Sequence, residues 1–365
     1  MHIDFNGKII NKKEIRAGFI GCGSHSFRNL YSCFQFTPVN LVAVCDLDYQ
    51  KAEAFATKFG TAAAYSNHHK MLAEEELDAV FICTGYDSKG RPLYPGLTVD
   101  CLQADCHVWI EKPPAASCND IELMQNAANA AKKNVVVGMK KMFFPANEKA
   151  KELMSNENFG TPQLVTLQYP QYIPSTEEFN DYIQNNKSNL VVTFLDHLCH
   201  PASLLIFLLG MPDVLHYERS CSGAGIATFR YISGTVASII FTHGSSQNGG
   251  MERTMIISDK GQHITVENNT RVTLHQIPPL GYGNVPNFYI GKPEQVSAVW
   301  EPEFSLGQLY NKGLFLLGYY NEINDFAESI LQNRRPSKGT LKQAWQVTHI
   351  FEAFAAGPGK QISLT

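Results

Sequence analysis

The 365-residue sequence lacks several features that would assign it to a special class of protein. Its net charge is −4, so it has no excess of basic residues for binding nucleic acid. No stretch approaches the roughly 20 consecutive apolar residues of a membrane span. The N-terminal stretch MHIDFNGKIINKKEIR is polar and has no apolar core of the kind found in signal peptides. We therefore expect a cytoplasmic protein that binds neither nucleic acid nor a membrane.

Paired cysteines are missing as well. The nine cysteines occur singly and no two of them form a CxxC pair. They are Cys22, Cys33, Cys45, Cys83, Cys101, Cys106, Cys118, Cys199 and Cys221. Several lie in strand-like apolar runs, which predicts reduced core thiols and agrees with a cytoplasmic location. The composition, 44% hydrophobic and 18% charged, is that of an ordinary globular protein.

The first part of the chain, residues 1–145, alternates short apolar runs with amphipathic helical patterns. The chain is long enough for two domains, because single cores rarely grow beyond about 250–300 residues. Strands are predicted at 15–21, 40–46, 77–85, 106–113 and 134–139, and helices at 48–60 and 118–133. This alternation predicts an α/β Rossmann domain, a doubly wound parallel sheet with right-handed crossovers.

The remaining residues, 146–365, have a different pattern. Alternating strand candidates at 163–170, 225–243, 253–268 and 271–277 are separated by Gly and Asn turn signals. Helices are predicted at 146–155, 194–209, 319–333 and 341–357. We predict an α+β domain with a large, mostly antiparallel open sheet, whose last helices pack back toward the first domain. The stretch 276–312, rich in Pro, Gly and Tyr, is predicted to be a long loop.

An open sheet with one uncovered face would expose apolar surface, which usually means burial against another subunit. Strand residues such as Ile239, Phe241, Met255 and Ile257 could supply that face. We therefore predict a homo-oligomer, a dimer or tetramer, formed through the sheet of the second domain.

A glycine-rich turn follows the first predicted strand. In GCGSHS (21–26), Gly21 and Gly23 occupy the first two positions of GxGxxG, and Ser26 occupies the third. The first glycine allows a tight turn and the second lets the backbone approach a pyrophosphate. Asp46 ends the second strand near the spacing expected for an acid that binds the ribose hydroxyls. A carboxylate there favours NAD over NADP; a helix-capping role is the alternative.

Two further motifs contain chemically active residues. Lys112, between Glu111 and Pro113, lies at the C-terminal end of a predicted strand, the edge where open α/β sheets bind ligands. Asp196 and His200, four residues apart, lie on one face of a predicted apolar helix. An acid–base pair, a buried hydrogen-bond network, and a metal site that includes His197 are the alternatives. No further ligand stands at a metal-binding spacing, so we expect no metal there. His68 and His69 are expected in a surface turn without a function.

The four motifs in order, GxGxxS, Asp46, Glu-Lys-Pro and DxxxH, resemble the Gfo/Idh/MocA family of oxidoreductases, which includes inositol dehydrogenase and glucose–fructose oxidoreductase. The resemblance implies hydride transfer between nicotinamide and a secondary hydroxyl of a sugar or cyclitol. It implies that Lys112 contacts cofactor and substrate, that Asp196 is the partner acid and that His200 is the general base. The implied cofactor contacts are Gly21, Gly23, Ser24, His25, Ser26, Asp46, Thr84, Gly85, Glu111 and Lys112.

The sequence departs from the family pattern at several positions. Ser26 replaces a glycine, Gly85 stands where proline is frequent, and Met142 stands where arginine is frequent. Residues 86–95 lengthen a loop at the cofactor edge. These departures affect the expected contacts to nicotinamide and substrate, but not the fold.

Candidate substrate residues are Lys141, Tyr172, His197 and Tyr282. Aromatic residues at 169–183 and in the 280–310 loop, among them Tyr289 and Trp300, could stack on a sugar ring, which suggests a glycoside oxidised at C3 of glucose. They could equally form a subunit interface.

Two other functions stay open. One is a redox-neutral NAD-assisted lyase, hydrolase or hydratase that uses Tyr172 or the pair Lys140–Lys141 as a second base. The other is a non-catalytic NAD- or sugar-sensing regulator. The presence of Lys112, Asp196 and His200 together argues against the regulator, because sensing alone does not need them.

Overall fold

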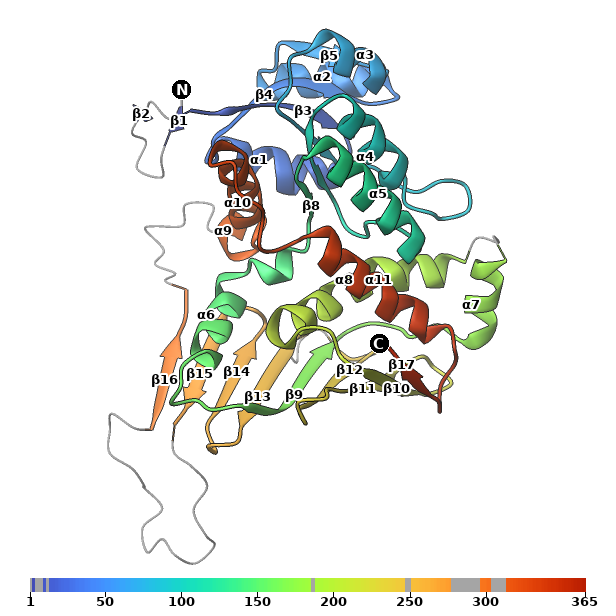
Figure 1. Ribbon diagram of the computed structural model, residues 1–365, viewed down its shortest axis with the longest axis vertical. Helices are drawn as coiled ribbons and strands as arrows, with labels where there is room; N and C mark the ends of the chain where they lie inside the picture. The colour runs from blue at the N-terminus through green and yellow to red at the C-terminus, as the bar shows by residue number, and fades with distance from the viewer. Residues whose placement is uncertain are drawn as a thin grey trace, which may run out of the picture.

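The first domain is built on a six-stranded sheet that is parallel throughout (Figure 1). The computed structural model describes residues 13–184, 188–246, 251–276, 296–302 and 313–365, together with the paired short strands β1 (His2–Ile3) and β2 (Ile9–Ile10). The strands of the sheet, in spatial order, are β5 (Ala63–Tyr65), β4 (Val39–Cys45), β3 (Ile15–Ile20), β6 (Ala79–Ile82), β7 (His107–Ile110) and β8 (Val135–Val137). The order reverses between β3 and β6, which makes their carboxyl ends the topological switch point where ligands bind.

Helices cover both faces of this sheet, as expected for the predicted Rossmann fold, which is confirmed. They are a π-helical turn (Ser26–Leu30), α1 (Tyr31–Phe34), α2 (Tyr49–Phe59), α3 (His68–Glu74), α4 (Tyr94–Gln103) and α5 (Cys118–Ala131). The predicted helices at 48–60 and 118–133 correspond to α2 and α5, which begin after the capping side chains of Asp48 and Ser117. The sequence pattern missed β5, α3 and α4. His68 and His69 were expected in a surface turn, but they form the first turn of α3.

The second domain contains a nine-stranded sheet in which only β9 and β12 pair in parallel. Its strands in spatial order are β16 (Ser297–Trp300), β15 (Arg271–His275), β14 (His263–Glu267), β13 (Arg253–Ser258), β9 (Pro162–Tyr169), β12 (Val236–Phe241), β11 (Gly225–Arg230), β10 (Val214–Arg219) and β17 (Gln361–Ser363). The prediction of a large, mostly antiparallel sheet is therefore confirmed. Strands β10, β16 and β17 were not predicted.

Helices lie between this sheet and the first domain, and among the described residues no helix lies on the opposite face of the sheet (Figure 1). The helical segments after β8 are a 3₁₀ turn (Lys140–Met142), α6 (Pro145–Met154), α7 (Thr176–Ile183), α8 (Asn189–Leu209), α9 (Gly313–Leu316), α10 (Tyr319–Leu331) and α11 (Leu341–Phe354). On the helix side, the Phe241 ring of β12 packs against Phe194 of α8 and Phe354 of α11. Aromatic burial between sheet and helices therefore fixes α8 over the centre of the sheet.

The length and mean hydropathy of α8 would suffice for a membrane span, but 61% of its most apolar window is buried inside the protein. This helix starts five residues before the predicted residue 194, at the cap Ser188. Its apolar character is that of a core helix packed on both sides, and the described chain has no second helix of this kind.

The prediction for the residues of the uncovered sheet face was wrong in part. Ile239 and Phe241 are 0% and 1% exposed because they point toward α8 and α11. Met255 and Ile257, half-buried, point the other way, since side chains alternate along a strand and Met255 pairs with Thr166. Ile226 and Val236, 49% and 39% exposed, also lie on the uncovered face.

The last helices return to the first domain. Phe326 of α10 packs edge-on against Phe81 of β6 in the core of the Rossmann sheet. Glu352 of α11 accepts a hydrogen bond from the Cys118 backbone N–H at the start of α5. The last helices therefore join the two domains through a packed aromatic pair and a hydrogen bond.

Candidate functional site

The glycine-rich turn leaves β3 at the switch point of the parallel sheet. Gly21 has φ +111°, and a Cβ at this position would lie 2.0 Å from the Cys83 carbonyl oxygen, so only glycine fits. Ser26, in the third position of the motif, is fully buried. Its hydroxyl donates to the Gly21 carbonyl at 2.9 Å and accepts from the Gly23 N–H at 3.1 Å. The serine that departs from the family pattern therefore fixes the turn.

Asp46 follows β4 and is joined to the same turn. Its Oδ2 accepts a hydrogen bond from the Cys22 N–H at 2.8 Å, and its Oδ1 accepts one from the Asp48 N–H at 3.0 Å. Each carboxylate oxygen has a second lone pair left for a ligand hydroxyl. The capping role considered for this acid belongs instead to Asp48, which accepts from the Gln50 N–H and begins α2.

A cavity of about 640 Å³ opens over this turn. Eight of the ten residues predicted to contact the cofactor line it: Gly21, Gly23, Ser24, His25, Ser26, Asp46, Thr84 and Gly85. Glu111 and Lys112 are not among its lining residues. The sequence pattern missed Leu47, Ser66, His68, Leu93, Leu97 and Asp100, most of which belong to the unpredicted α3 and α4 or the segments that precede them.

The residues at this cavity fit a dinucleotide. At Gly23 the nearest atom to an added Cβ is Ser26 Oγ, 3.9 Å away, so the backbone there is open and a pyrophosphate can approach it. The Thr84 hydroxyl oxygen is buried and has no hydrogen-bond partner among the described residues, so a polar ligand atom can satisfy it. Asp46 supplies the acceptor for ribose hydroxyls at the end of β4.

Lys112 and Asp196 form the centre of a second polar cluster. Lys112 follows β7, and its Nζ donates to Asp196 Oδ1 of α8 at 2.8 Å. The Tyr86 hydroxyl donates to the same oxygen at 3.2 Å. Burial by itself would lower the pKa of Lys112, but Glu111 and Asp196 together raise it above its ordinary value. Lys112 therefore stays charged and can donate a hydrogen bond to a ligand oxygen.

His200 lies one helical turn after Asp196, and its side chain is nearly fully buried. Burial lowers the pKa of His200 well below its ordinary value, and the positive charges of Lys112, Lys140 and Lys141 lower it further. The imidazole is therefore neutral near pH 7, which is the form that can accept a proton.

The expected contact between Asp196 and His200 is not formed. In the described part of the chain no hydrogen bond or ion pair joins them, because the Asp196 carboxylate is directed toward Lys112 and Tyr86. The nearest imidazole to Asp196 is that of His197, 3.6 Å away. Four-residue spacing gives two side chains a common helix face, but it does not decide which partner each one meets.

His200 lines a cavity of about 530 Å³ next to α8 and the start of β13. Most of its polar groups come from six residues: Lys140, Lys141, Tyr169, Glu252, Asn268 and Asn269. Glu252 forms an ion pair with Lys141 and accepts a hydrogen bond from Asn269 Nδ2 at 2.9 Å. Sequence reasoning missed Glu252 and the two asparagines, whose positive φ angles mark the tight turn between β14 and β15.

The other predicted substrate residues lie elsewhere. Tyr172 does not line this cavity; its hydroxyl donates to Glu178 at 2.9 Å. His197 lies beside Asp196, with 45% of its side chain exposed. Trp300 packs under the Lys149 ammonium, 4.8 Å from its ring centre. Tyr282 and Tyr289, like most of the predicted 276–312 loop, lie outside the described residues.

A chain of contacts connects the two cavities. Lys140, which lines the second cavity, donates to the Tyr319 hydroxyl at 3.1 Å, and that hydroxyl lies 3.5 Å from His25 Nε2. His25 lines the first cavity, and its Nε2 lies 2.9 Å from Glu111 Oε1. The dinucleotide cavity and the His200 cavity are therefore neighbours.

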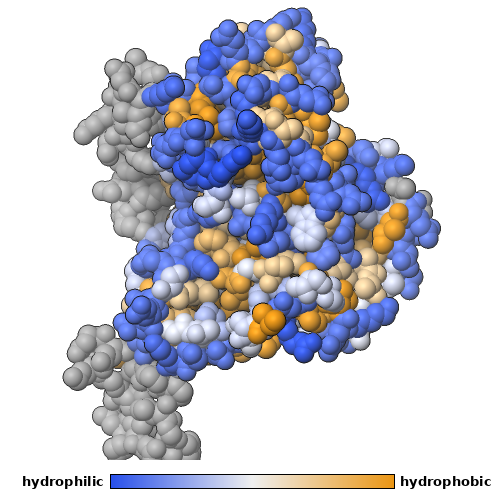
Figure 2. Space-filling view, in the orientation of Figure 1, coloured by the Kyte–Doolittle hydropathy of each residue, from blue (hydrophilic) through white to orange (hydrophobic). Residues whose placement is uncertain are grey.

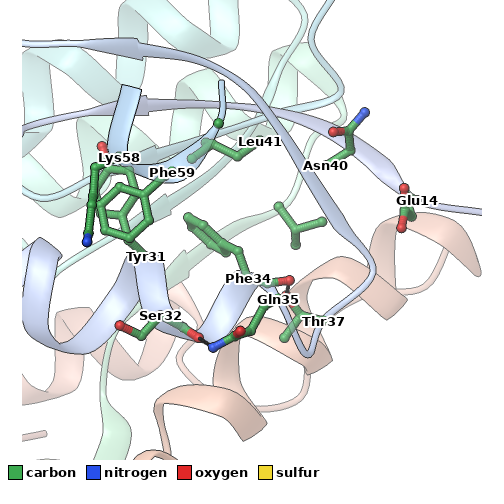
Figure 3. Close-up of a pocket in the computed structure, with 12 residues that line it drawn as sticks. Glu14, Tyr31, Ser32, Phe34, Gln35, Thr37, Asn40, Leu41, Lys58 and Phe59 are labelled. Carbon is green, nitrogen blue, oxygen red and sulfur yellow. Dashed lines mark hydrogen bonds between the residues drawn. The ribbon is translucent and has the colours of Figure 1, made fainter. Parts of the chain in front are cut away.

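Another cavity, of about 560 Å³, lies away from these groups between α1, α2 and β4 (Figure 3). Tyr31, Phe34 and Phe59 form its apolar wall, and Ser32, Gln35 and Lys58 its polar edge. None of the predicted cofactor or catalytic residues lines it, so we assign the functional site to the cleft between the domains.

Comparison with known proteins relates the first domain to a family and the whole chain to solved folds. Residues 15–139 match the model of the Gfo/Idh/MocA family, described as an oxidoreductase family with an NAD-binding Rossmann fold. The first domain therefore resembles this family over the matched residues. The resemblance seen in the sequence is confirmed for the first domain, and the residues that line the 640 Å³ cavity all lie within the matched segment.

Named relatives of the Gfo/Idh/MocA domain include sugar and cyclitol dehydrogenases. A myo-inositol 2-dehydrogenase from Thermotoga maritima is 23% identical over 54% of this chain and 55% of its own. A D-glucoside 3-dehydrogenase from Escherichia coli is 29% identical over 43% of this chain and 44% of its own. The aligned segments thus span about half the length of these relatives.

Solved structures show the same two-domain fold along nearly the whole chain. A dehydrogenase from Chromobacterium violaceum superimposes with a TM-score of 0.76 at 20% identity, covering 94% of this chain and 95% of its own. The myo-inositol 2-dehydrogenase from Lactobacillus plantarum gives a TM-score of 0.70 at 19% identity, covering 97% and 100%.

Proposed function

We propose that this protein is an NAD-dependent dehydrogenase that oxidises a secondary hydroxyl of a sugar, cyclitol or glycoside. The observation that supports this most directly is the position of Lys112 and His200 at the cleft beside the dinucleotide cavity. Lys112 is a charged donor held by Asp196 at 2.8 Å, and His200 is a buried imidazole with a lowered pKa. An alcohol oxidation needs these two groups, a base for the hydroxyl proton and a donor for the oxygen.

In this mechanism bound NAD supplies the hydride acceptor. The neutral imidazole of His200 removes the proton from the substrate hydroxyl, and Lys112 donates a hydrogen bond to the same oxygen as negative charge develops there. Asp196, which also accepts a hydrogen bond from the Tyr86 hydroxyl, holds the Lys112 side chain in position rather than orienting the imidazole. A base positioned in this way contributes roughly 10²–10⁴-fold in rate.

The lining of the His200 cavity supports a polyhydroxylated substrate. Glu252 is fixed by Lys141 and Asn269, and a carboxylate held in this way can accept hydrogen bonds from sugar hydroxyls. Lys140 and Asn268 offer further polar contacts on the same wall. Oxidation at C3 of a glucoside is one form of the proposal, and one relative carries the name D-glucoside 3-dehydrogenase.

We also propose that NAD is preferred over NADP. In support, a carboxylate at the end of β4 repels an adenosine 2′-phosphate, and none of the described residues that line the cavity is an arginine or lysine. Relatives differ in this respect, since a D-xylose 1-dehydrogenase from Haloferax volcanii is named for NADP(+). The alternatives of a redox-neutral enzyme or a sensor are not favoured, because the relatives above are named as dehydrogenases.

The proposed compartment is the cytoplasm. All nine cysteines are free thiols in the structure, although the chain offers enough of them for several disulfides. A reducing environment keeps such thiols unpaired.

The function is tested by incubating the protein with NAD and a panel of sugars, cyclitols and glucosides, and following NADH absorbance and product mass. The variant His200→Asn should lose roughly 10²–10⁴-fold in kcat. Tyr172→Phe is the matched control, because Tyr172 lies outside the cavity, and it should act like the wild type. NAD binding without NADH formation or product on the whole panel would contradict the proposal.

A further inference from the structure

The side chains of His68, His69 and Asp100 converge at the edge of the dinucleotide cavity. Asn67 caps α3 by accepting from the Lys70 N–H, so the two histidines occupy its first turn. Successive helical residues normally point about 100° apart around the axis. Here the two rings lie 4.0 Å apart, and both Nε2 atoms face Asp100 Oδ2 of α4, at 2.9 and 3.8 Å.

This arrangement has the composition of a transition-metal site. Two imidazole nitrogens and one carboxylate oxygen lie within 4.8 Å of one another. A tetrahedral zinc ion with ligand bonds of about 2.0–2.2 Å requires ligand atoms roughly 3.4 Å apart. The two distances to Asp100 Oδ2 lie on either side of that value. The His69 side chain is 64% exposed, so it can adjust when an ion binds.

The donor set also indicates which metals such a site would favour. Imidazole nitrogen favours zinc, nickel, cobalt or copper, whereas magnesium and calcium prefer oxygen ligands throughout. Three protein ligands leave a fourth tetrahedral position for water or another ligand. The site is distinct from His197 and His200, which are on α8 in the cleft and have no third ligand of this geometry in the described part of the chain.

Another group of metal-ligating residues, Cys118, His349 and Glu352, lies where α5 meets α11. Burial raises the pKa of the Cys118 thiol far above its ordinary value, and Glu352 raises it further. A metal would have to displace the proton from this buried thiol. Glu352 also already caps α5 through the Cys118 N–H. This second group therefore has a structural role, and a variant in it provides a control for the zinc titration.

We propose that His68, His69 and Asp100 bind a divalent transition-metal ion, with zinc as the reference ion, at the edge of the NAD cavity. His68 and Asp100 both line that cavity. An ion held by them connects α3 to α4, which form two neighbouring walls of the cofactor site. If zinc shifts α3 relative to α4, it alters the shape of the NAD cavity. Zinc therefore changes the affinity for NAD, and NAD changes the affinity for zinc by the same factor.

The test is a calorimetric titration of zinc chloride into the untagged, chelator-treated full chain, with the absorption spectrum of bound cobalt as a report on tetrahedral geometry. The wild type should bind one ion at this site. His69→Ala and Asp100→Asn should weaken its binding by about tenfold or more, as expected for loss of one ligand. His349→Ala, which removes a ligand of the second group, should leave the affinity unchanged.

A second titration measures NAD binding with and without saturating zinc. The NAD affinity should change with zinc in the wild type and stay constant in His69→Ala, since His69 does not line the cofactor cavity. Three results would overturn the proposal: no zinc binding in the micromolar range, equal zinc affinity in wild type and His69→Ala, or loss of binding in His349→Ala instead. An NAD affinity independent of zinc in the wild type would overturn the coupling.

Discussion

At the scale of single residues, the site depends on how charges are distributed around His200. Three lysines surround this histidine, and together with burial they keep its imidazole neutral. Lys112 instead keeps its charge, because Asp196 and Glu111 lie close to it. The environment thus moves the pKa values of the two groups apart, which gives the cleft a base and a hydrogen-bond donor at the same pH.

The lowered pKa of His200 predicts the pH dependence of the reaction. A histidine with an ordinary pKa would become protonated, and inactive as a base, as the pH falls through 6.5. Because the pKa of His200 lies well below that value, kcat/KM should stay level through pH 6.5 and decrease only in more acidic solution. The measurement is a pH profile of kcat/KM by NADH absorbance. A midpoint at or above 6.5 would show that another group controls the acid side.

Asp46 should determine the choice of cofactor. Asp46→Asn removes the negative charge and keeps one acceptor for the Cys22 N–H, while the hydrogen bond from the Asp48 N–H is lost. The ratio of NAD affinity to NADP affinity should decrease by about tenfold, because the hydrogen bond from the ribose hydroxyl to the charged carboxylate is lost. Both affinities are measured by calorimetry.

The matched control is Asp48→Asn, the same change of charge two residues later. Asp48 caps α2 and does not line the cofactor cavity, so this variant should keep the wild-type ratio. If both variants changed the affinity ratio equally, the net negative charge of this region, and not a direct contact of Asp46 with the ribose, would determine the preference.

At the scale of secondary structure, the turn between β3 and the first helix combines two different requirements for glycine. Gly21 has no room for a side chain and has a positive φ, so its requirement is structural. Gly23 has an ordinary φ, and the nearest atom to a Cβ there is Ser26 Oγ at 3.9 Å. The fold by itself would accept a side chain at Gly23, and the requirement there comes from the ligand whose pyrophosphate the backbone approaches.

Two alanine substitutions should therefore separate stability from binding. Gly21→Ala should decrease the free energy of unfolding by about 3 kcal/mol or more, because of the overlap with Cys83 and the strained φ. Gly23→Ala should leave the free energy of unfolding near the wild-type value but weaken NAD binding. Urea denaturation and NAD titration of both variants provide the check. Normal NAD binding by Gly23→Ala would mean that the pyrophosphate lies elsewhere.

At the scale of the whole molecule, the helices fill the space between the two domains, and no described helix covers the other face of the nine-stranded sheet (Figure 1). In the view of Figure 2, hydrophobic side chains gather between the domains and over the second domain, while hydrophilic ones dominate the outer edge. The uncovered sheet face carries Ile226, Val236, Met255 and Ile257, all at least partly exposed. We propose that a second copy of the chain covers this face.

Charged substitutions on this sheet face should change the oligomeric state of the protein in solution. Sedimentation at micromolar concentration should show a dimer or tetramer for the wild type and a smaller species for the double variant Ile226→Glu and Val236→Glu. Ile232→Glu is the control, because Ile232 is 95% exposed in the turn between β11 and β12. A monomeric wild type would rule out this interface.

The sequence predicted the elements whose periodicity is strong and missed those that depend on their surroundings. β3, β4, α2 and α5 have buried apolar runs or clear caps, and each was located within one or two residues. β5 is three half-buried residues long and α3 begins with two histidines, so neither has a periodic signal. α7 was missed because its apolar residues are few, although Ser175 and Glu178 form a capping box at its start.

The sequence by itself determined the groups whose positions follow from local geometry: the turn at Gly21, the acid at the end of β4, the lysine at the end of β7, and a histidine on an apolar helix. Strand ends and helix faces fix these positions within a few residues. Only the tertiary structure decided which of these groups meet. It pairs Asp196 with Lys112, 84 positions earlier, rather than with His200, and brings Glu252 to Lys141 across 111 positions. Contacts between residues so far apart depend on how the two domains pack, and no local pattern specifies that packing.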